Sequence, residues 1–289
     1  MNGILLIDKP EGWTSNDVVQ KLRGMLRERR IGHSGTLDPM ATGLLVVFVG
    51  RATRAVEFAE QHDKRYVAGL RLGLTTNTQD ITGNTISNRD KLPTEQELIN
   101  ALDGFKGEIS QIPPMYSAIK VNGQRLYEIA RRGGEVERKA RQIKIHSLDV
   151  IGKQEGDYLL DVRCSKGTYI RTLCNDLGES LGCGGCMSSL RRIEAGRFSL
   201  ENAVTLETVQ DYVNRKEAEQ LLMSVDRLFD YCLECKVNAS QEKRLRCGSL
   251  VDIELPDGEY RVYSENGEFL LLGRVKNKVL TTIKNFFEV

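Results

Sequence analysis

The sequence has no apolar stretch long enough to span a lipid bilayer, which takes about 20 consecutive apolar residues. Its start carries only a brief apolar patch before Asp8, Lys9 and Pro10, so we expect no secretory signal. It also has no internal repeat and no low-complexity tract. We therefore expect a cytoplasmic globular protein without membrane contact.

An excess of charge of one sign is also missing, since 41 basic and 40 acidic residues leave a formal net charge of +1. The basic residues are nevertheless clustered, whereas acidic residues gather in residues 201–234 and near the C-terminus. Local basic patches suit phosphate binding whatever the total charge, although each patch alone is more often a solvated helix face. The two basic segments contain Lys21, Arg23, Arg27, Arg29 and Arg30, and then Arg125, Arg131, Arg132, Arg138, Lys139, Arg141 and Lys144.

The seven cysteines do not form a recognisable metal or disulfide framework. Two Cys-x-x-Cys pairs occur, at Cys183 and Cys186 and at Cys232 and Cys235. They lie farther apart than the roughly 15–20 residues of a zinc ribbon, and no histidine is near the first pair. We expect reduced thiols, no bound metal and, in the absence of any cofactor motif, no cofactor.

The composition is that of an ordinary globular chain, with 289 residues of which 40% are hydrophobic and 28% charged. This length allows a large domain with a small one, and we expect them at residues 1–235 and 236–289, the second rich in short strands. Periodicity predicts strands at residues 3–7, 44–49, 64–74, 142–153 and 157–164. It predicts helices at residues 17–26, 52–60, 95–102, 124–132 and 168–181. Ser15 and Thr168 are the expected N-caps of the first and last helix.

One loop, residues 32–43, organises the rest of the chain. It contains a single carboxylate, Asp38, and is followed at once by the apolar run of residues 44–49. Pro39 biases Asp38 toward extended geometry, and the run between Gly43 and Gly50 is typical of a buried strand. The pattern predicts a rigid loop that presents one acid at the end of a central strand.

Counting residues excludes two common site types for this loop. A serine-hydrolase elbow needs Gly-x-Ser-x-Gly, but Gly35 follows Ser34 directly. A phosphate-binding P-loop needs a lysine, and none lies between Gly32 and Gly50. From these residues alone, Asp38 is either a reactive carboxylate or an aspartate that caps its own turn.

The loop fills every fixed position of Gly-His-x-Gly-x-Leu-Asp-Pro-x-Ala-x-Gly. It thereby resembles the catalytic loop of the TruB family of tRNA pseudouridine-55 synthases. Other segments similar to that family follow in order between about Ile4 and Gly196, at residues 6–10, 63–66, 112–118, 166–171 and 190–192. Where the family has an Asp-rich loop, this chain keeps one acid, Asp80. The C-terminal unit is similar to a PUA domain, an RNA-binding β-barrel.

The resemblance implies an α+β protein with the pseudouridine synthase fold. This fold has a central, largely antiparallel mixed sheet flanked by helices, and here a PUA-like unit would follow it. The implied reaction converts the uridine at tRNA position 55, in the T-loop, to pseudouridine. The N1–C1′ bond breaks, the base rotates and it rejoins through C5, without redox change, metal or cofactor. The uridine must first be flipped out of its folded loop.

The same resemblance assigns three catalytic residues. Asp38 matches the family nucleophile, although attack on the base, attack on the sugar and action as a base all stay open. Arg171 would pair with the Asp38 carboxylate through a bidentate contact and keep it ionised. Tyr66 would stack on the extracted base, near the C5 proton that must leave.

Five further residues are expected to bind the substrate. Tyr169 and Leu190 would wall the pocket and keep water out. His33 would lie near the vacated base position, and Lys9 would be a supporting or RNA-contacting residue. Asp80 is the fifth.

The implied partner is tRNA, and we expect a monomer without an obligate protein partner. Two alternatives remain. A non-catalytic tRNA-binding or folding factor is disfavoured because Asp38, Tyr66 and Arg171 are all present. The catalytic subunit of a guide-RNA-directed pseudouridylation complex is disfavoured because such subunits usually carry longer terminal extensions.

Overall fold

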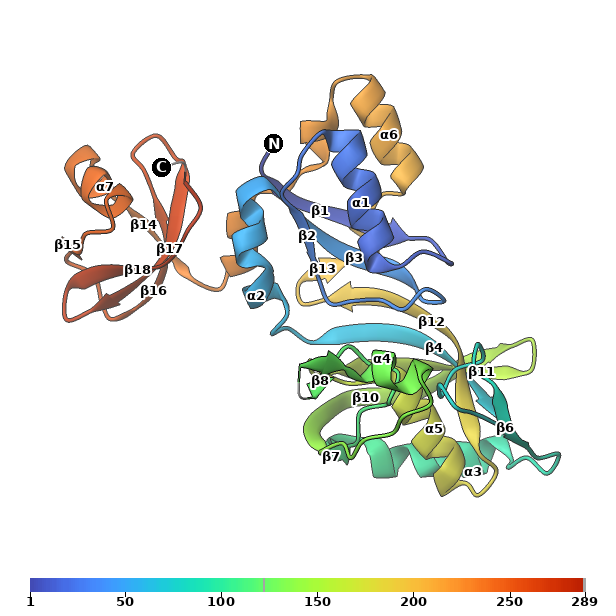
Figure 1. The fold of residues 1–289 in the computed structure, drawn as a ribbon. Coiled ribbons are helices and arrows are strands. Elements are labelled where there is room, and N and C mark those ends of the chain that lie inside the picture. Colours follow the sequence, from blue (N-terminus) through green and yellow to red (C-terminus); the bar gives the residue numbers. More distant parts are fainter. Residues whose placement is uncertain (122, 288–289) are drawn as a thin grey trace.

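The computed structural model describes residues 1–121 and 123–287 and centres on one large sheet (Figure 1). The strands follow the order β1-β3-β12-β4-β11-β10-β7, with β2 also paired to β3 and β13 to β12. All of these pairs are antiparallel except β3 with β12. The expected α+β fold with a largely antiparallel mixed sheet is confirmed. The strands are β1 (Gly3–Lys9), β2 (Ile31–Ser34), β3 (Thr42–Val49), β4 (Lys64–Leu72), β7 (Gly107–Gln111), β10 (Arg141–Gln154), β11 (Asp157–Cys164), β12 (Gly185–Ala195) and β13 (Phe198–Ser199).

Helices cover parts of this sheet, and short strand pairs extend its connections. The α-helices are α1 (Ser15–Leu26), α2 (Val56–Ala59), α3 (Glu95–Leu102), α4 (Leu126–Arg131), α5 (Ile170–Ser180), α6 (Leu206–Asn214) and α7 (Ala239–Arg246). Short 3-10 helices are η1 (Gly50–Ala55), η2 (Asp103–Phe105), η3 (Leu200–Asn202), η4 (Ala218–Leu221) and η5 (Val225–Phe229). The strand pairs are β5 (Leu74–Thr76) with β6 (Thr85–Asn88), and β8 (Lys120–Val121) with β9 (Gln124–Arg125).

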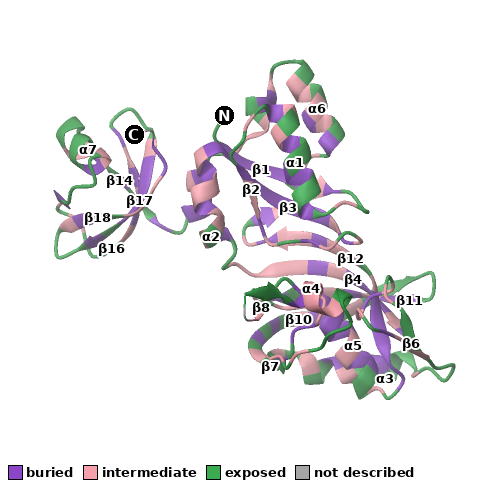
Figure 2. Ribbon diagram, viewed as in Figure 1, coloured by how far each residue is buried: buried purple, intermediate pink, exposed green. Residues whose placement is uncertain are grey.

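Strands β1 and β3 are buried on both faces, which explains why their sequences are continuously apolar rather than alternating (Figure 2). Leu5 and Ile7 pack with α1 and α6 on one side, while Ile4 and Leu6 pack with η5 on the other. Each fully buried aliphatic side chain contributes about 1.5–3 kcal/mol. The strand that follows the Asp38 loop is therefore among the most firmly packed in the molecule.

The first helix begins at Ser15, two residues before the expected start at residue 17. Thr14 is its N-cap, because its hydroxyl accepts from the amide of Asp17 and the Asp17 carboxylate accepts from the amide of Thr14. Ser15 is buried instead, and its hydroxyl bonds the amide and carbonyl of Leu37 at 2.8 and 3.1 Å. The N-cap assignment to Ser15 was wrong because this serine contacts the Asp38 loop.

Helix α5 has no side-chain cap, and its N-cap residue is held from another element. Its N-cap is Tyr169, so the assignment of Thr168 was wrong, and the Thr168 hydroxyl donates to the carbonyl of Ser165. The side chain of Gln111 in β7 accepts from the Tyr169 amide at 2.8 Å and donates to its carbonyl at 3.1 Å. This places Tyr169 just before the helix, with Arg171 in the first turn as expected.

A second sheet forms near the C-terminus, in the order β14-β16-β17-β18-β15. It has its own hydrophobic core, which includes Val262, Leu271 and Leu280. In Figure 1 the second sheet lies beside α2, and the rings of Phe229, Phe269 and Phe286 cluster where it meets the part of the chain built around the large sheet. Its strands are β14 (Leu233–Lys236), β15 (Val251–Asp252), β16 (Gly258–Tyr263), β17 (Phe269–Lys276) and β18 (Val279–Asn285).

Within residues 1–121 and 123–287, no helix is long and apolar enough to cross a membrane. The seven cysteines are free thiols, six of them buried. Burial raises the pKa of Cys186 and of Cys235 to about 11 in each case, so both thiols are protonated near neutral pH. No group of three or more histidine, cysteine or acidic side chains in the described chain is arranged to hold a metal ion.

Candidate active site

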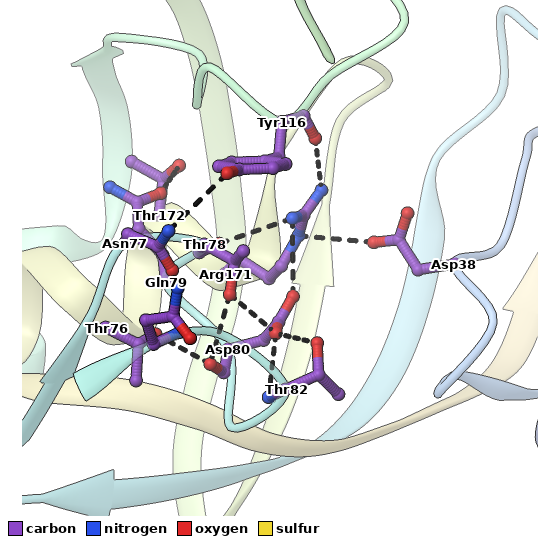
Figure 3. A network of polar contacts seen from close by, with 11 residues as sticks. Asp38, Thr76, Asn77, Thr78, Gln79, Asp80, Thr82, Tyr116, Arg171 and Thr172 are labelled. Carbon is purple, nitrogen blue, oxygen red and sulfur yellow. Dashed lines mark hydrogen bonds and ion pairs between the residues drawn. The ribbon is translucent and has the colours of Figure 1, made fainter. Parts of the chain in front are cut away.

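Asp38 lies in the connection between β2 and β3, outside any helix. The amide of Ala41 bonds the Asp38 carbonyl at 3.0 Å, which closes a turn that contains Pro39. The carboxylate is 40% exposed, and its Oδ2 lies 3.2 Å from Nε of Arg171 (Figure 3). The loop therefore presents an accessible carboxylate to a buried guanidinium.

Arg171 contacts more than Asp38. Its side chain is 8% exposed, and its Nη1 lies 3.3 Å from both the carbonyl of Thr78 and Oδ2 of Asp80. Its Nη2 donates to the carbonyl of Tyr116 at 2.8 Å. Because these donors have other partners, the ion pair with Asp38 runs through Nε to one oxygen. The expected bidentate contact is thus corrected to a single one.

Asp80 lies on the other side of this guanidinium from Asp38 (Figure 3). Its Oδ1 accepts from the amide and hydroxyl of Thr82 at 3.0 and 2.6 Å and from the hydroxyl of Thr78 at 2.8 Å. The carboxylate is 6% exposed, so these bonds replace the water it has lost. Arg171 is accordingly held by two carboxylates. That of Asp80 is buried and fixed by hydrogen bonds, and that of Asp38 is partly exposed to solvent.

Tyr66 is buried in β4, directly opposite Arg192 of β12 in the antiparallel register. Burial raises the pKa of its phenol, the guanidinium of Arg192 opposes that rise, and the charge of Asp38 adds to it. The pKa stays above its usual value near 10, so Tyr66 is a neutral phenol at neutral pH.

A cavity of about 310 Å³ lies next to the segments that carry these groups, although Asp38, Tyr66, Asp80 and Arg171 do not themselves line it. Leu190 of β12 lines it, together with Met40 and Thr42 from the Asp38 loop and Ile81 and Thr82 from the turn around Asp80. The cavity thus lies between the two segments that provide carboxylates to Arg171. Its wall is partly apolar, which suits the flat face of a nucleobase.

Tyr169 is half-buried immediately before α5, two residues from Arg171. The guanidinium of Arg141 lies over its ring, 5.7 Å from the ring centre. The ring is therefore near the site but stacked with a cation of the basic segment 125–144.

His33 and Lys9 lie on the other side of the Asp38 loop. Burial and the charge of Arg192 lower the pKa of His33, so its ring is neutral, and its buried Nδ1 has no partner among the described residues. Lys9 is fully buried, and its Nζ donates to the carbonyls of Pro10, Trp13 and Pro39 at 2.9, 2.5 and 3.3 Å. Of its two predicted roles, this position favours support of the loop.

Comparison with known proteins agrees with this geometry. Residues 23–170 match the family model described as TruB family pseudouridylate synthase (N terminal domain). Residues 171–230 match the model of the tRNA pseudouridylate synthase B C-terminal domain. The chain belongs to the TruB family.

Similar curated proteins span nearly its whole length. A tRNA pseudouridine synthase B of Clostridium kluyveri is 42% identical over 99% of this chain and 100% of that protein. One from Aromatoleum aromaticum is 43% identical over 94% of this chain and 88% of its own. Among solved structures, a crystal structure of a Cbf5-Nop10-Gar1 complex matches with a TM-score of 0.75 and 26% identity, covering 99% of this chain and 85% of that chain.

The structure also brings in residues that motif matching did not single out. Tyr116 contributes its main-chain carbonyl to Arg171, and a carbonyl contact carries no sequence signal. Arg192 lies in a segment similar to the TruB family but was given no role, and Ser15 was read as a helix cap. Each acts through contacts between segments far apart in the chain.

Proposed function

We propose that this chain is a tRNA pseudouridine synthase that converts the uridine at position 55 of the T-loop to pseudouridine. The observation that carries the proposal is the ion pair between the exposed carboxylate of Asp38 and the buried guanidinium of Arg171, beside a cavity of base-compatible character. It occurs in a chain of the TruB family whose relatives are named tRNA pseudouridine synthase B.

Asp38 supplies the chemistry. Arg171 orients the ionised carboxylate, and Asp80 fixes Arg171 from behind. The carboxylate acts on the sugar or the base as a nucleophile, or as a base toward the sugar. The N1–C1′ bond breaks, the base rotates, C5 bonds to C1′, and the proton on C5 moves to N1 overall. The reaction is an isomerisation, so no atom is gained or lost.

The remaining residues position the base and exclude water. Tyr66 presents a neutral aromatic side chain on which the flipped uracil stacks, near the proton that C5 loses. Leu190, which lines the cavity, and Tyr169, which lies outside that lining and two residues before Arg171 in sequence, are assigned to keep water from an intermediate. His33 lies near the vacated base position, while Lys9 supports the loop from below. Asp80 contributes to substrate binding through Arg171.

Binding of tRNA compensates the few kcal/mol that base flipping costs. Exposed basic residues around α4 face solvent, and the guanidinium groups of Arg125 and Arg131 lie 5.8 and 5.4 Å from the centre of the Tyr127 ring. We assign catalysis to residues 1–235 and RNA binding to a PUA-like unit at residues 236–289, supported by the separate core of the second sheet. The enzyme acts in the cytoplasm as a monomer.

A guide-dependent subunit is the second candidate, because the similar solved structure is a Cbf5-Nop10-Gar1 complex. The curated relatives, at about 40% identity over nearly the full chain, favour the stand-alone enzyme. Naked RNA without guide or protein partner distinguishes the two.

The test measures pseudouridine in a T-loop hairpin and in full-length tRNA, with wild type, Asp38→Asn and Asp90→Asn as a matched surface control. We expect Asp38→Asn to bind RNA like wild type but to lose at least about a thousandfold in rate, because the reacting carboxylate is gone. Asp90→Asn should match wild type. Activity retained by Asp38→Asn would contradict the mechanism, and wild type that binds but modifies neither RNA would contradict the enzyme.

A further inference from the structure

Arg192 is the largest fully buried side chain in the described structure, with 1% exposure. Its neighbour Arg191 pairs with Asp8 at 2.7 Å, and Arg171 pairs with two carboxylates. Within residues 1–121 and 123–287, Arg192 has no carboxylate partner. A buried charge without an ion pair is costly, so its hydrogen bonds have to compensate for lost hydration.

Those hydrogen bonds go to the two ends of the Asp38 loop. Nε donates to the carbonyl of Leu44 at 2.7 Å, and Nη2 donates to the carbonyl of Gly35 at 2.9 Å. Gly35 precedes Asp38 and Leu44 follows it, so one rigid guanidinium spans the base of the loop. Hydrogen bonds from a charged donor are stronger than those between neutral groups.

Two glycines of the loop lie against Arg192, Gly35 against its side chain and Gly43 against its main chain. A Cβ at Gly35 would lie 3.1 Å from Nη1 of Arg192, and one at Gly43 would lie 2.3 Å from the Arg192 carbonyl oxygen. Both glycines also have positive φ, at 70° and 95°. The loop can therefore approach this strand only with glycine at both places.

Arg192 also lies next to the second predicted catalytic side chain. Tyr66 of β4 is directly opposite Arg192 of β12 in the register, so the two side chains leave the sheet on the same face. Burial is the main cause that lowers the pKa of Lys9, His33 and Lys64, and the positive charge of Arg192 adds to each shift. One side chain thus bonds the main chain on both sides of Asp38 and lies opposite Tyr66.

We infer that Arg192 is a positioning residue for the proposed isomerisation, which sets the Asp38 carboxylate and the Tyr66 phenol relative to each other from beneath the site. The inference rests on the proposed function of Asp38. Misplacement of a reacting group by about 1 Å can lower a rate about a hundredfold. Lysine has a single nitrogen and cannot span Leu44 and Gly35 while reaching Tyr66.

The experiment compares Arg192→Lys and Arg192→Met with a matched control, Arg65→Met. Arg65 precedes Tyr66 but forms its ion pairs with Asp161 and Glu194 on a partly exposed face. We expect the single-turnover rate on saturating T-loop hairpin to fall about a hundredfold with lysine and further with methionine. RNA Kd should stay within about threefold and Arg65→Met should equal wild type, because binding residues are untouched.

A second readout does not depend on activity. Hydrogen exchange of the amides in residues 35–43 should quicken in folded Arg192→Lys and not in Arg65→Met, because lysine cannot form both main-chain hydrogen bonds that hold the loop. If wild type makes no pseudouridine, the proposed function fails, but the hydrogen exchange still tests whether Arg192 holds the loop. A wild-type rate or wild-type protection in Arg192→Lys would overturn the inference, as would a rate loss that only parallels weaker RNA binding. If Arg192→Met does not fold, the lysine variant decides.

Discussion

Two segments reach the guanidinium of Arg171 from different sides, and they are held in different ways (Figure 3). The Asp38 loop, residues 35–43, is fastened from beneath by buried side chains, namely Lys9, Ser15 and Arg192. The Tyr116 segment, residues 112–118, is held instead through its main chain, since the Pro113 carbonyl accepts from Arg138 at 3.3 Å and the Ser117 carbonyl from the Tyr127 amide at 3.1 Å. The Tyr116 carbonyl accepts from Arg171, and its hydroxyl lies 3.4 Å from Nδ2 of Asn77.

This difference separates the segment that carries the reacting carboxylate from the segment that leads to the proposed RNA-binding residues. The Asp38 loop cannot shift without breaking several buried hydrogen bonds, each costing about 1–3 kcal/mol if its partner is left unpaired. The Tyr116 segment leads into α4 and the exposed basic residues that we propose to bind RNA. A shift of this segment toward RNA breaks main-chain bonds at Pro113, Tyr116 and Ser117 but none of the bonds that Lys9, Ser15 and Arg192 make to the Asp38 loop.

Arg171→Lys tests the difference between the two segments with the largest expected effect, because Arg171 contacts both of them. A single ammonium cannot contact Asp38, Asp80 and the Tyr116 carbonyl together, so Asp38 loses its orientation. We expect the single-turnover rate to fall about a hundredfold or more, with RNA affinity changed only modestly. Quench-flow kinetics and a filter-binding titration measure the two.

Arg71→Lys is the matched control, since Arg71 pairs with Asp157 on the outer face of β4. It should keep the wild-type rate, because the Arg71–Asp157 pair touches neither the Asp38 loop nor Arg171. A wild-type rate in Arg171→Lys would mean that Asp38 does not need the guanidinium.

A smaller effect is expected from the pH dependence of Lys9. Burial lowers the pKa of Lys9 from 10.5 to about 8. Below that pH its ammonium donates to three carbonyls, whereas the neutral amine has two protons for three acceptors. We expect turnover to fall by about tenfold as the pH rises above 8, because the carbonyl of Pro39 beside Asp38 loses its donor. Lys9→Met should be slower near neutral pH and lack this fall.

Stability should move in the opposite direction. The folded protein binds fewer protons at Lys9 than the unfolded chain between about pH 8 and 10.5. The contribution of Lys9 to the free energy of unfolding therefore rises with pH through that window. Urea unfolding of wild type and Lys9→Met at both ends of the window measures the difference. A parallel fall of stability and turnover would show that Lys9 acts through global unfolding.

Structural features that depend on neighbouring residues could be predicted from the sequence, whereas features that depend on contacts between distant segments could not. Pro39, Gly43 and the apolar run after them act within a few residues, so the loop and β3 could be predicted. Strand β2 could not, because its four residues become a strand only by pairing with β3. Arg191 and Arg192 look alike in sequence, but alternate faces of β12 send one to Asp8 and bury the other.

The same distinction holds for the residues of the site. Asp38 and Arg171 were identified by motif, and their contact through Nε follows from Asp80 and Tyr116 having claimed the other donors. Those partners come from three separate connections, whose packing no single segment encodes. The two N-cap errors have the same origin, since Ser15 contacts Leu37 and the N-cap residue of α5 is held by Gln111.

The smallest effect on turnover is expected from the recognition side, where Arg131→Glu/Arg132→Glu reverses two exposed charges on and just after α4. If these residues contact phosphates, RNA affinity should weaken about tenfold or more, and the slope of log K against log salt should become shallower by about 1.5. The rate at saturating RNA should stay within about twofold, because no bond of the Asp38 loop is touched.

Lys21→Glu/Arg29→Glu gives the matched comparison, because these exposed residues belong to the other basic segment, on and after α1. Filter binding from low to high salt ranks the two surfaces directly. Unchanged affinity and slope in the first variant would make residues 125–144 a solvated face, and a loss confined to the second would move the RNA to α1. A large drop in the saturated rate for either pair would mean that recognition and chemistry are coupled through Tyr116 after all.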